Sequence, residues 1–185
     1  FYVEKSLTFD KLDLLLGIRE NLHEESKHRT VYDISASYRI GSSRLHIHFG
    51  TGFRVPSLYE LNGAFLSSFG RFEVGNPNLS PERSRGFDIG LDHRIGKNIG
   101  LGATYFDSVI RNRIDFVGSS YVNTDGSYRT HGLEAYYEQF LFGFLLARGS
   151  WTRTLGEMLI DVPRDAYSFA LRAERTKWNA SVRGT

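Results

Sequence analysis

The sequence predicts an all-β protein, namely an antiparallel, up-and-down transmembrane β-barrel segment of about ten strands. Two observations lead to this prediction. Apolar and polar residues alternate along most of the chain. The connections between the alternating segments are short after one segment and long after the next. In a membrane barrel, apolar side chains face lipid and polar ones face the lumen, which produces both patterns. No run of 18 apolar residues occurs, so the sequence predicts no transmembrane helix.

The alternation is clearest in five separate segments, which cover residues 32–40, 44–54, 86–95, 132–139 and 166–175. Successive side chains of a strand point to opposite faces, so each segment has one apolar and one polar face. On the apolar side we expect five residues to face lipid: Ile34, Ile47, Ile89, Leu133 and Phe169. On the polar side we expect five to face the lumen: Asp33, His46, Asp88, Glu134 and Arg172.

The connections divide the chain into strands at about 1–9, 12–20, 30–40, 44–54, 82–94, 99–117, 121–140, 143–155, 164–175 and 178–184. Tight turns follow every odd strand. Longer or more polar links follow the second, fourth, sixth and eighth strands, at residues 21–29, 55–81, 118–120 and 156–163. Short turns on one rim and long loops on the other are typical of outer-membrane barrels. A soluble β-sandwich also has alternating strands, but it gives no reason for this regular change of loop length.

Composition and motifs argue against several other functions. The chain has no cysteine, and its net charge of +2 gives no electrostatic case for nucleic-acid binding. His46 and His48 share one face of a strand, but without further ligands a polar wall explains them better than a metal site. No nucleophile motif or glycine-rich phosphate loop occurs. We therefore predict no enzyme activity, no catalytic residue, no metal and no cofactor.

The segment from Val55 to Pro81 is the longest link, and we expect it to be irregular. Pro56 cannot donate a hydrogen bond to a ladder, so the preceding strand should end near Arg54. Asn78 can form an Asx turn with its own backbone. Pro81 then precedes the next strand, which should begin near Glu82. These features predict a loop that folds back over the rim of the barrel.

Two stretches of this region, residues 53–61 (FRVPSLYEL) and 75–91 (GNPNLSPERSRGFDIGL), resemble the paired sequence boxes of TonB-dependent outer-membrane receptors. We call them the first and the second box. Further similar stretches lie at residues 14–21, 31–40, 100–116 and 121–138, so the resemblance covers essentially the whole chain. The residues that match the box patterns, which we expect to shape the loop, are Phe53, Arg54, Pro56, Asn76, Pro77, Asn78, Leu79, Pro81 and Glu82.

The resemblance implies a 22-stranded barrel in the bacterial outer membrane, filled by a separate N-terminal plug domain. Residues 1–185 would then be part of one barrel domain, without the plug and the terminal strands. It also implies a receptor that imports a bulky small-molecule ligand, powered through the periplasmic partner TonB. Haem receptors of this family place a histidine between the boxes, but residues 57–75 contain none. The expected cargo is therefore cobalamin or a ferric siderophore.

Aromatic and basic residues between the boxes are the candidates for ligand contact, because binding residues concentrate on loops held by a rigid scaffold. They are Tyr59, Phe65, Phe69, Arg71 and Phe72. An alternative is a self-contained ten-stranded barrel that acts as a surface protease or an adhesin. A protease would need Asp and His at the long-loop rim, where His28, Asp125 and His131 are the candidates.

Overall fold

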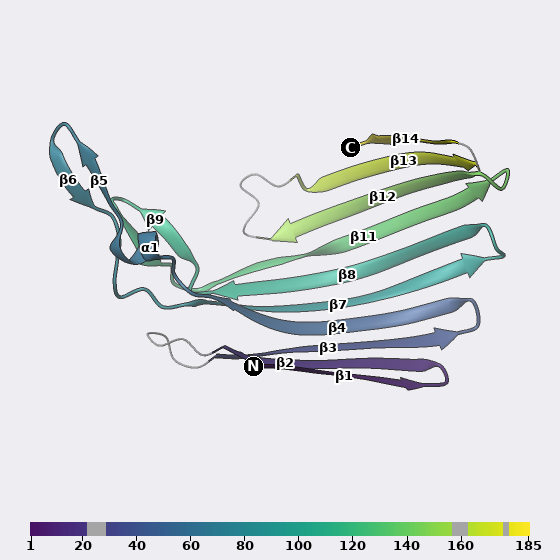
Figure 1. The fold of residues 1–185 in the computed structure, drawn as a ribbon, viewed down its shortest axis with the longest axis horizontal. Helices are drawn as coiled ribbons and strands as arrows, with labels where there is room; N and C mark the ends of the chain where they lie inside the picture. The colour runs from purple at the N-terminus through teal and green to yellow at the C-terminus, as the bar shows by residue number, and fades with distance from the viewer. Residues whose placement is uncertain (22–28, 157–162, 176–177) are drawn as a thin grey trace.

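A computed structural model describes residues 1–21, 29–156, 163–175 and 178–185. Ten long antiparallel strands form one sheet, in which each strand pairs with its neighbours in chain order (Figure 1). This confirms the predicted all-β, up-and-down arrangement. The strands are β1 (Tyr2–Phe9), β2 (Leu12–Asn21), β3 (Arg29–Ile40), β4 (Ser43–Arg54), β7 (Glu82–Ile95), β8 (Ile99–Arg111), β11 (Ser127–Leu141), β12 (Leu145–Gly156), β13 (Asp165–Arg175) and β14 (Trp178–Gly184).

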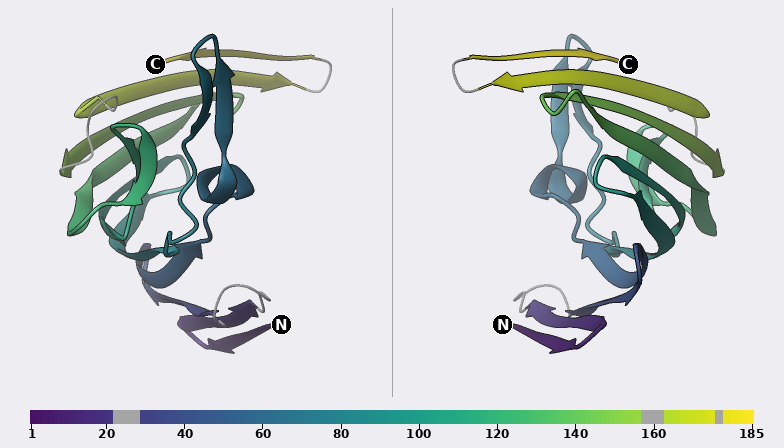
Figure 2. Two further views of the ribbon diagram at one scale, coloured as in Figure 1. Left: turned by 90° about the vertical axis from the view of Figure 1, so that its left-hand side faces the viewer. Right: turned by 90° about the vertical axis from the view of Figure 1, so that its right-hand side faces the viewer.

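The sheet is a curved wall with a concave and a convex face (Figure 2). β1 and β14 are its two edges, and they lie at opposite ends of the arc. Among the described residues no pairing joins these two edges, so the ten strands form an open arc and not a closed barrel. An open edge exposes unpaired backbone groups, which a barrel removes by closing the sheet.

Tight turns connect the strands at one rim of the wall. Gly41, Gly96 and Gly143 adopt positive φ angles of 58°, 61° and 70° in the turns between β3 and β4, β7 and β8, and β11 and β12. Glycine adopts such angles without steric cost, which allows the chain to reverse within two or three residues. The predicted turn between the last two strands includes residues 176–177, which lie outside the described residues.

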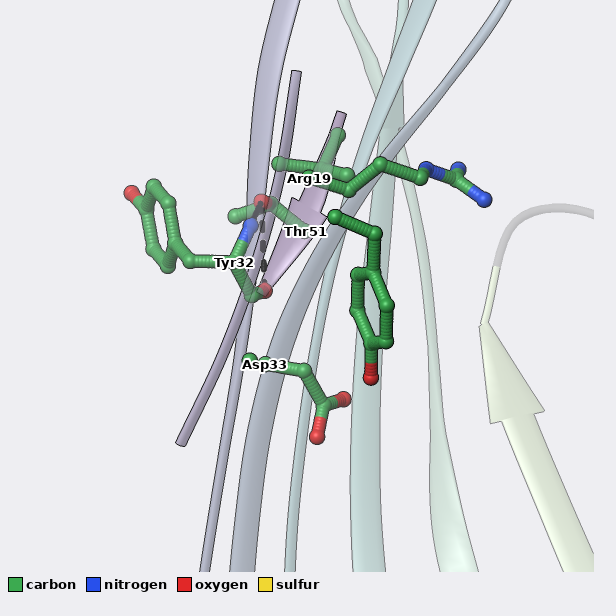
Figure 3. Close-up of a pocket in the computed structure, with 7 residues that line it drawn as sticks. Arg19, Tyr32, Asp33 and Thr51 are labelled. Carbon is green, nitrogen blue, oxygen red and sulfur yellow. Dashed lines mark hydrogen bonds between the residues drawn. The ribbon is translucent and has the colours of Figure 1, made fainter. Parts of the chain in front are cut away.

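The strand register puts the polar and apolar residues on opposite faces, as predicted. Ile47 lies beside Ile89 on the neighbouring strand, and Asp88 lies beside His48. Figure 3 shows the alternation within β3, where the side chains of Tyr32 and Asp33 point to opposite sides. A hydrogen bond of 3.1 Å from the Tyr32 amide to the Thr51 hydroxyl ties β3 to β4 at this point.

Two charged residues identify which face is concave. Arg54 and Glu82 stand at even spacing from His48 and Asp88 on β4 and β7, so all four share one face. Arg54 contacts the only helix in the described part of the chain, which lies on the concave side in Figure 2. The polar face is therefore the concave one. The convex face is apolar across its middle. Its charged residues include Lys5 on the edge strand, beside Leu16, and a group of arginines on β7, β8 and β11 nearer the long-loop rim.

The long-loop rim differs from the prediction in two places. The predicted strands 99–117 and 121–140 are each broken in two. The first is broken where Asn112 takes a left-handed φ of 55° after β8, and the second in the link before β11, where Gly126 has a φ of 96°. The chain then folds into a separate hairpin of β9 (Ile114–Val117) and β10 (Ser120–Asn123). The 55–81 link is also not irregular throughout. It contains α1 (Leu58–Asn62) and a hairpin of β5 (Ala64–Ser67) and β6 (Gly70–Glu73). No helix in the described residues has the length and apolarity needed to cross a membrane.

Candidate functional site

The first box forms the N-terminus of the short helix α1, which follows the end of β4. Ser57 is the N-cap residue of α1, and its hydroxyl accepts a hydrogen bond of 3.2 Å from the Glu60 amide. In return, the Glu60 carboxylate accepts one of 2.7 Å from the Ser57 amide. This reciprocal pair is a capping box, which stabilises the first turn of a helix. The Ser-x-x-Glu spacing in the sequence was a signal for α1 that our sequence analysis missed.

Arg54 joins the two boxes through one guanidinium group. Its Nε and Nη2 donate to the two carboxylate oxygens of Glu82, at 2.9 Å each. Its Nη1 donates to the Glu60 carboxylate at 3.0 and 2.9 Å. Glu82 also accepts a hydrogen bond of 2.8 Å from the Ile114 amide, which lies at the base of the β9–β10 hairpin. These contacts therefore meet at one point. They join the end of β4 to the start of β7, to α1 and to the β9–β10 hairpin.

Glu60 is the acidic partner that belongs to the loop itself. Burial raises the pKa of its carboxyl, but the hydrogen bonds from the Ser57 amide and the Arg54 guanidinium outweigh burial and hold the pKa below its usual value. Its side chain is only 13% exposed. The ionised form is therefore the one that the loop structure favours.

In the second box, Asn76 is the residue that organises the backbone. Its side-chain nitrogen donates to the Tyr121 carbonyl at 3.0 Å, and its side-chain oxygen accepts from the Asn78 backbone amide at 3.0 Å. Our prediction of an Asx turn made by Asn78 was therefore wrong, since the turn is made by Asn76. The reason is geometric: Pro77 follows Asn76 and fixes the chain so that the Asn78 amide returns to the side chain that precedes the proline.

The 55–81 link and the β9–β10 hairpin pack together as one unit above the wall. Val74, Leu79 and Ile114 are buried between them. The side-chain oxygen of Asn123 accepts a hydrogen bond of 2.7 Å from the Ser80 amide, while its nitrogen donates to the Ser80 carbonyl at 2.9 Å. Because side-chain amides satisfy loop backbone groups and a small apolar cluster is buried, the two loops support each other.

Aromatic side chains form one group at the base of this unit. Tyr59 on α1 meets Tyr121 on β10 edge to face, with ring centroids 6.2 Å apart. Phe116 on β9 meets the same Tyr121 at 5.2 Å. Our sequence analysis missed Phe116 and Tyr121, because it assigned both to long transmembrane strands. The Asn112–Arg113 break offered little signal, since a left-handed asparagine cannot be read from composition.

A second aromatic group lies on the β5–β6 hairpin. Phe65 and Phe72 stack across its two strands with centroids 5.3 Å apart, and Phe69 at the tip is 91% exposed. Arg71 pairs with Glu73 at 2.8 Å, and both side chains are largely exposed. The five predicted ligand residues are therefore divided between two places: Tyr59 at the base, and Phe65, Phe69, Arg71 and Phe72 on the hairpin. Figure 2 shows α1 and the hairpin over the space that the arc encloses.

The other residues of the boxes occupy different positions. Phe53 points to the convex face, opposite to Arg54, and lines a surface groove with Arg83. Pro56 follows β4 and precedes the N-cap of α1. Pro77 and Asn78 lie at the exposed surface of the loop, while Pro81 immediately precedes β7.

Below the loops, the concave face carries a network of charged and polar side chains. His48 lies between two carboxylates, with its ring nitrogens 2.6 Å from Asp33 and 2.9 Å from Asp88. Asp92 accepts hydrogen bonds from Arg44, at 2.9 and 3.1 Å, and from the Tyr136 hydroxyl at 2.9 Å. His46 lies on the same face, with its Nε2 3.3 Å from the Thr104 hydroxyl. Both histidines therefore belong to a polar wall, which was the interpretation that the sequence favoured.

The residues considered for a surface protease do not form a described cluster. His28 lies outside the described residues. Asp125 lies in the exposed link before β11, whereas His131 lies on the convex side of β11 beside Asp107. The open arc likewise does not form the self-contained barrel of that alternative.

Comparison with known proteins identifies the same fold over the whole chain. The protein family described as "TonB dependent receptor-like, beta-barrel" matches residues 1–184. A search of curated proteins gave no match.

Several solved structures are similar to this one. The siderophore receptor PirA of Pseudomonas aeruginosa superposes with a TM-score of 0.76 at 20% identity, covering 99% of this chain and 39% of that protein. The ferric enterobactin receptor PfeA of the same species gives 0.80 at 18% identity, covering 98% of this chain and 31% of that one. The FrpB iron transporter of Neisseria meningitidis gives 0.68 at 14% identity, covering 98% and 31%. The chain thus spans less than two fifths of these structures.

Proposed function

This chain belongs to the TonB-dependent receptor family, as a segment of the β-barrel in the bacterial outer membrane, and we propose that the receptor imports a ferric siderophore. Import would begin with capture of the ligand on the loops at the long-loop rim. Transport would follow through the lumen, with energy supplied through TonB. The observation that carries the proposal is the aromatic loop unit, which Arg54 holds over the concave face of the wall.

The shape of the loop unit supports capture of a bulky ligand. Phe65, Phe69 and Phe72 are well exposed on the hairpin, although exposed aromatic side chains in water lose the benefit of burial. Aromatic anchors bury large area at low entropic cost when a ligand covers them, which is why they dominate many binding sites. Tyr59 and Tyr121 at the base add two hydroxyl groups that can donate hydrogen bonds.

The class of ligand is proposed from two lines of support. The similar structures include receptors named for siderophores and enterobactin, and two PfeA structures are described as complexes with enterobactin. In addition, residues 57–75 contain no histidine that could ligate haem iron. Cobalamin, the other ligand expected from the sequence, lacks comparable support among these structures, so we treat it as a competitor in the test.

The concave polar wall is proposed to contact the N-terminal plug domain of the full-length receptor. In charged pairs such as Arg44 with Asp92 and Arg148 with Glu138, the arginine side chains are more than half exposed on this face, so their guanidinium groups remain available for a polar partner. A plug would cover these groups and control passage of the ligand. In this proposal residues 1–185 belong to one barrel domain, whose plug and remaining strands lie elsewhere in the receptor.

The test is ligand binding to the purified full-length receptor in detergent. Ferric enterobactin, cyanocobalamin and haem are titrated separately, with apo-siderophore as the control for the metal. We expect ferric enterobactin or another ferric catecholate to bind at least about tenfold more tightly than cyanocobalamin and haem. Equal or tighter binding of cyanocobalamin would overturn the siderophore assignment.

A set of variants separates the loop from the rest of the receptor. Replacing Tyr59, Phe65, Phe69 and Arg71 together by alanine should weaken binding at least about tenfold, or about 1.4 kcal/mol. Tyr121→Ala should weaken binding in the same direction, because Tyr121 supports Tyr59 from the neighbouring hairpin. If the four-residue variant keeps its affinity and the barrel shows normal heat-modifiability, the ligand must bind to the plug or to other loops.

A further inference from the structure

Four arginines lie together on the convex face of the wall, just below the long-loop rim. We call this group the arginine tier, and it consists of Arg83 and Arg85 on β7, Arg111 on β8 and Arg129 on β11. The register brings them together, because Arg83 is paired with Arg111, while Arg85 and Arg129 are both paired with Val109. All four side chains are exposed.

The tier lies directly above the apolar part of the convex face. Along β7 the outward positions Leu91, Ile89 and Phe87 are followed by Arg85 and Arg83. Arg85 is two residues beyond Phe87, or roughly 7 Å further along the strand. An outer-membrane barrel carries an apolar band with aromatic residues at its edges, so the tier lies where the lipid headgroups begin.

The charge of the tier is mostly uncompensated. Arg129 forms an ion pair with Asp107, through Nε at 2.8 Å and a second contact from Nη2. Arg83, Arg85 and Arg111 form no hydrogen bond or ion pair with any residue in the described ranges. Four guanidinium groups and one carboxylate leave a local charge of +3. Like charges side by side repel each other, so a compensating anion would stabilise this arrangement.

A groove on the convex face gives the tier a shape as well as a charge. It has a volume of about 450 Å³ and is lined by Arg85, Arg111 and Arg129, by apolar Phe49, Phe87 and Val109, and by Asp107, the carboxylate that pairs with Arg129. Basic groups thus stand above an apolar floor. A lipid has the matching order, with an anionic headgroup next to hydrocarbon.

We propose that the arginine tier binds the phosphate of a phosphorylated lipid in the outer leaflet of the membrane around the receptor. The planar guanidinium group presents donors in a fork that matches phosphate oxygens, so two or more arginines can hold one phosphate. The lipid chains then lie against Phe49, Phe87 and the residues below them. The tier faces away from the lumen, so this site is separate from the path proposed for the imported ligand.

The test uses the full-length receptor and measures bound lipid by native mass spectrometry. The probes are bisphosphorylated lipid A, its dephosphorylated form and inorganic phosphate. We expect the wild type to prefer the bisphosphorylated lipid by at least about tenfold, and the preference to weaken as salt is raised. Equal binding of the two lipids would overturn the proposal, and so would tight binding of inorganic phosphate without lipid.

Variants assign the preference to the tier. The triple variant Arg85→Gln, Arg111→Gln and Arg129→Gln should lose most of the preference. The matched control removes three arginines from the concave face, with Arg39→Gln, Arg148→Gln and Arg172→Gln, and should keep it. Equal loss in both triple variants would contradict the proposal. If the variant of Arg85, Arg111 and Arg129 does not fold, as judged by heat-modifiability, the comparison of the two lipids on the wild-type receptor still tests the proposal.

Discussion

Arg54 and Glu82 form a two-pronged ion pair, with both nitrogen–oxygen distances at 2.9 Å, although they are 28 positions apart in the sequence. The pair closes the entire 55–81 link at its base, where β4 ends and β7 begins. The same guanidinium reaches Glu60, so the helix of the loop is tied to the wall as well. Arg54 therefore joins the base of the loop unit to both strands of the wall.

The first prediction follows from that bridge. Arg54→Gln should increase the hydrogen-exchange rate of the α1 amides several-fold, because Glu60 and Glu82 lose their shared cation. Since Arg54 is 46% exposed, we expect a moderate loss of local stability, about 1–2 kcal/mol. Arg71→Gln is the control, because Arg71 pairs only at the exposed surface of the hairpin. Exchange of α1 that is the same in both variants would show that the bridge does not hold the loop.

The second prediction concerns pH. The pKa of Glu60 is lowered in the folded loop, so the stability it contributes is present above its ordinary value of 4.5. That contribution is lost as pH falls through the lowered folded pKa. Protection factors of the α1 amides should therefore stay constant from neutral pH to about 5 and decrease at more acidic pH. Glu60→Gln should abolish this fall in protection at acidic pH and give protection factors that are lower at neutral pH and nearly independent of pH. If the variant shows the same fall as the wild type, a group other than Glu60 causes it.

The third prediction compares the two asparagines of the second box. Asn76→Ala removes the hydrogen bonds to Tyr121 and Asn78, and should reduce loop stability by about 1–2 kcal/mol and lower the folding yield. Asn78→Ala should have little effect, because the structure gives its side chain no hydrogen bond with a described residue. Refolding yield and thermal unfolding of the two variants provide the comparison. An Asn78 variant as unstable as the Asn76 variant would contradict the assigned Asx turn.

The fourth prediction tests the two faces of the wall. Ile89→Arg places a charge on the lipid side and should destabilise the barrel by about 2–4 kcal/mol if the residue lies near the middle of the bilayer. Asp88→Arg changes the concave side and should cost less, mainly through the lost contact with His48. Unfolding of the receptor in lipid vesicles measures both. Equal costs at the two neighbouring positions would reject the alternation of faces.

The sequence by itself determined the strand wall. Side chains alternate between faces with a period of two, so the pattern around Ile34, Ile47 and Ile89 predicted which face each residue occupies. Pro56 predicted the end of β4 and Pro81 predicted the start of β7, because proline cannot take part in a central ladder. These are local effects, and each depends only on residues within a few positions of one another.

The tertiary structure decided the loop unit. The capping box of Ser57 and Glu60 was local, but the links from Arg54 to Glu82 and from Asn76 to Tyr121 join residues 28 and 45 positions apart. Likewise, the arginine tier exists only because the register places β7, β8 and β11 side by side. Such contacts depend on how distant segments pair and pack, and a sequence pattern with a period of two carries no information about which strands become neighbours at the rim.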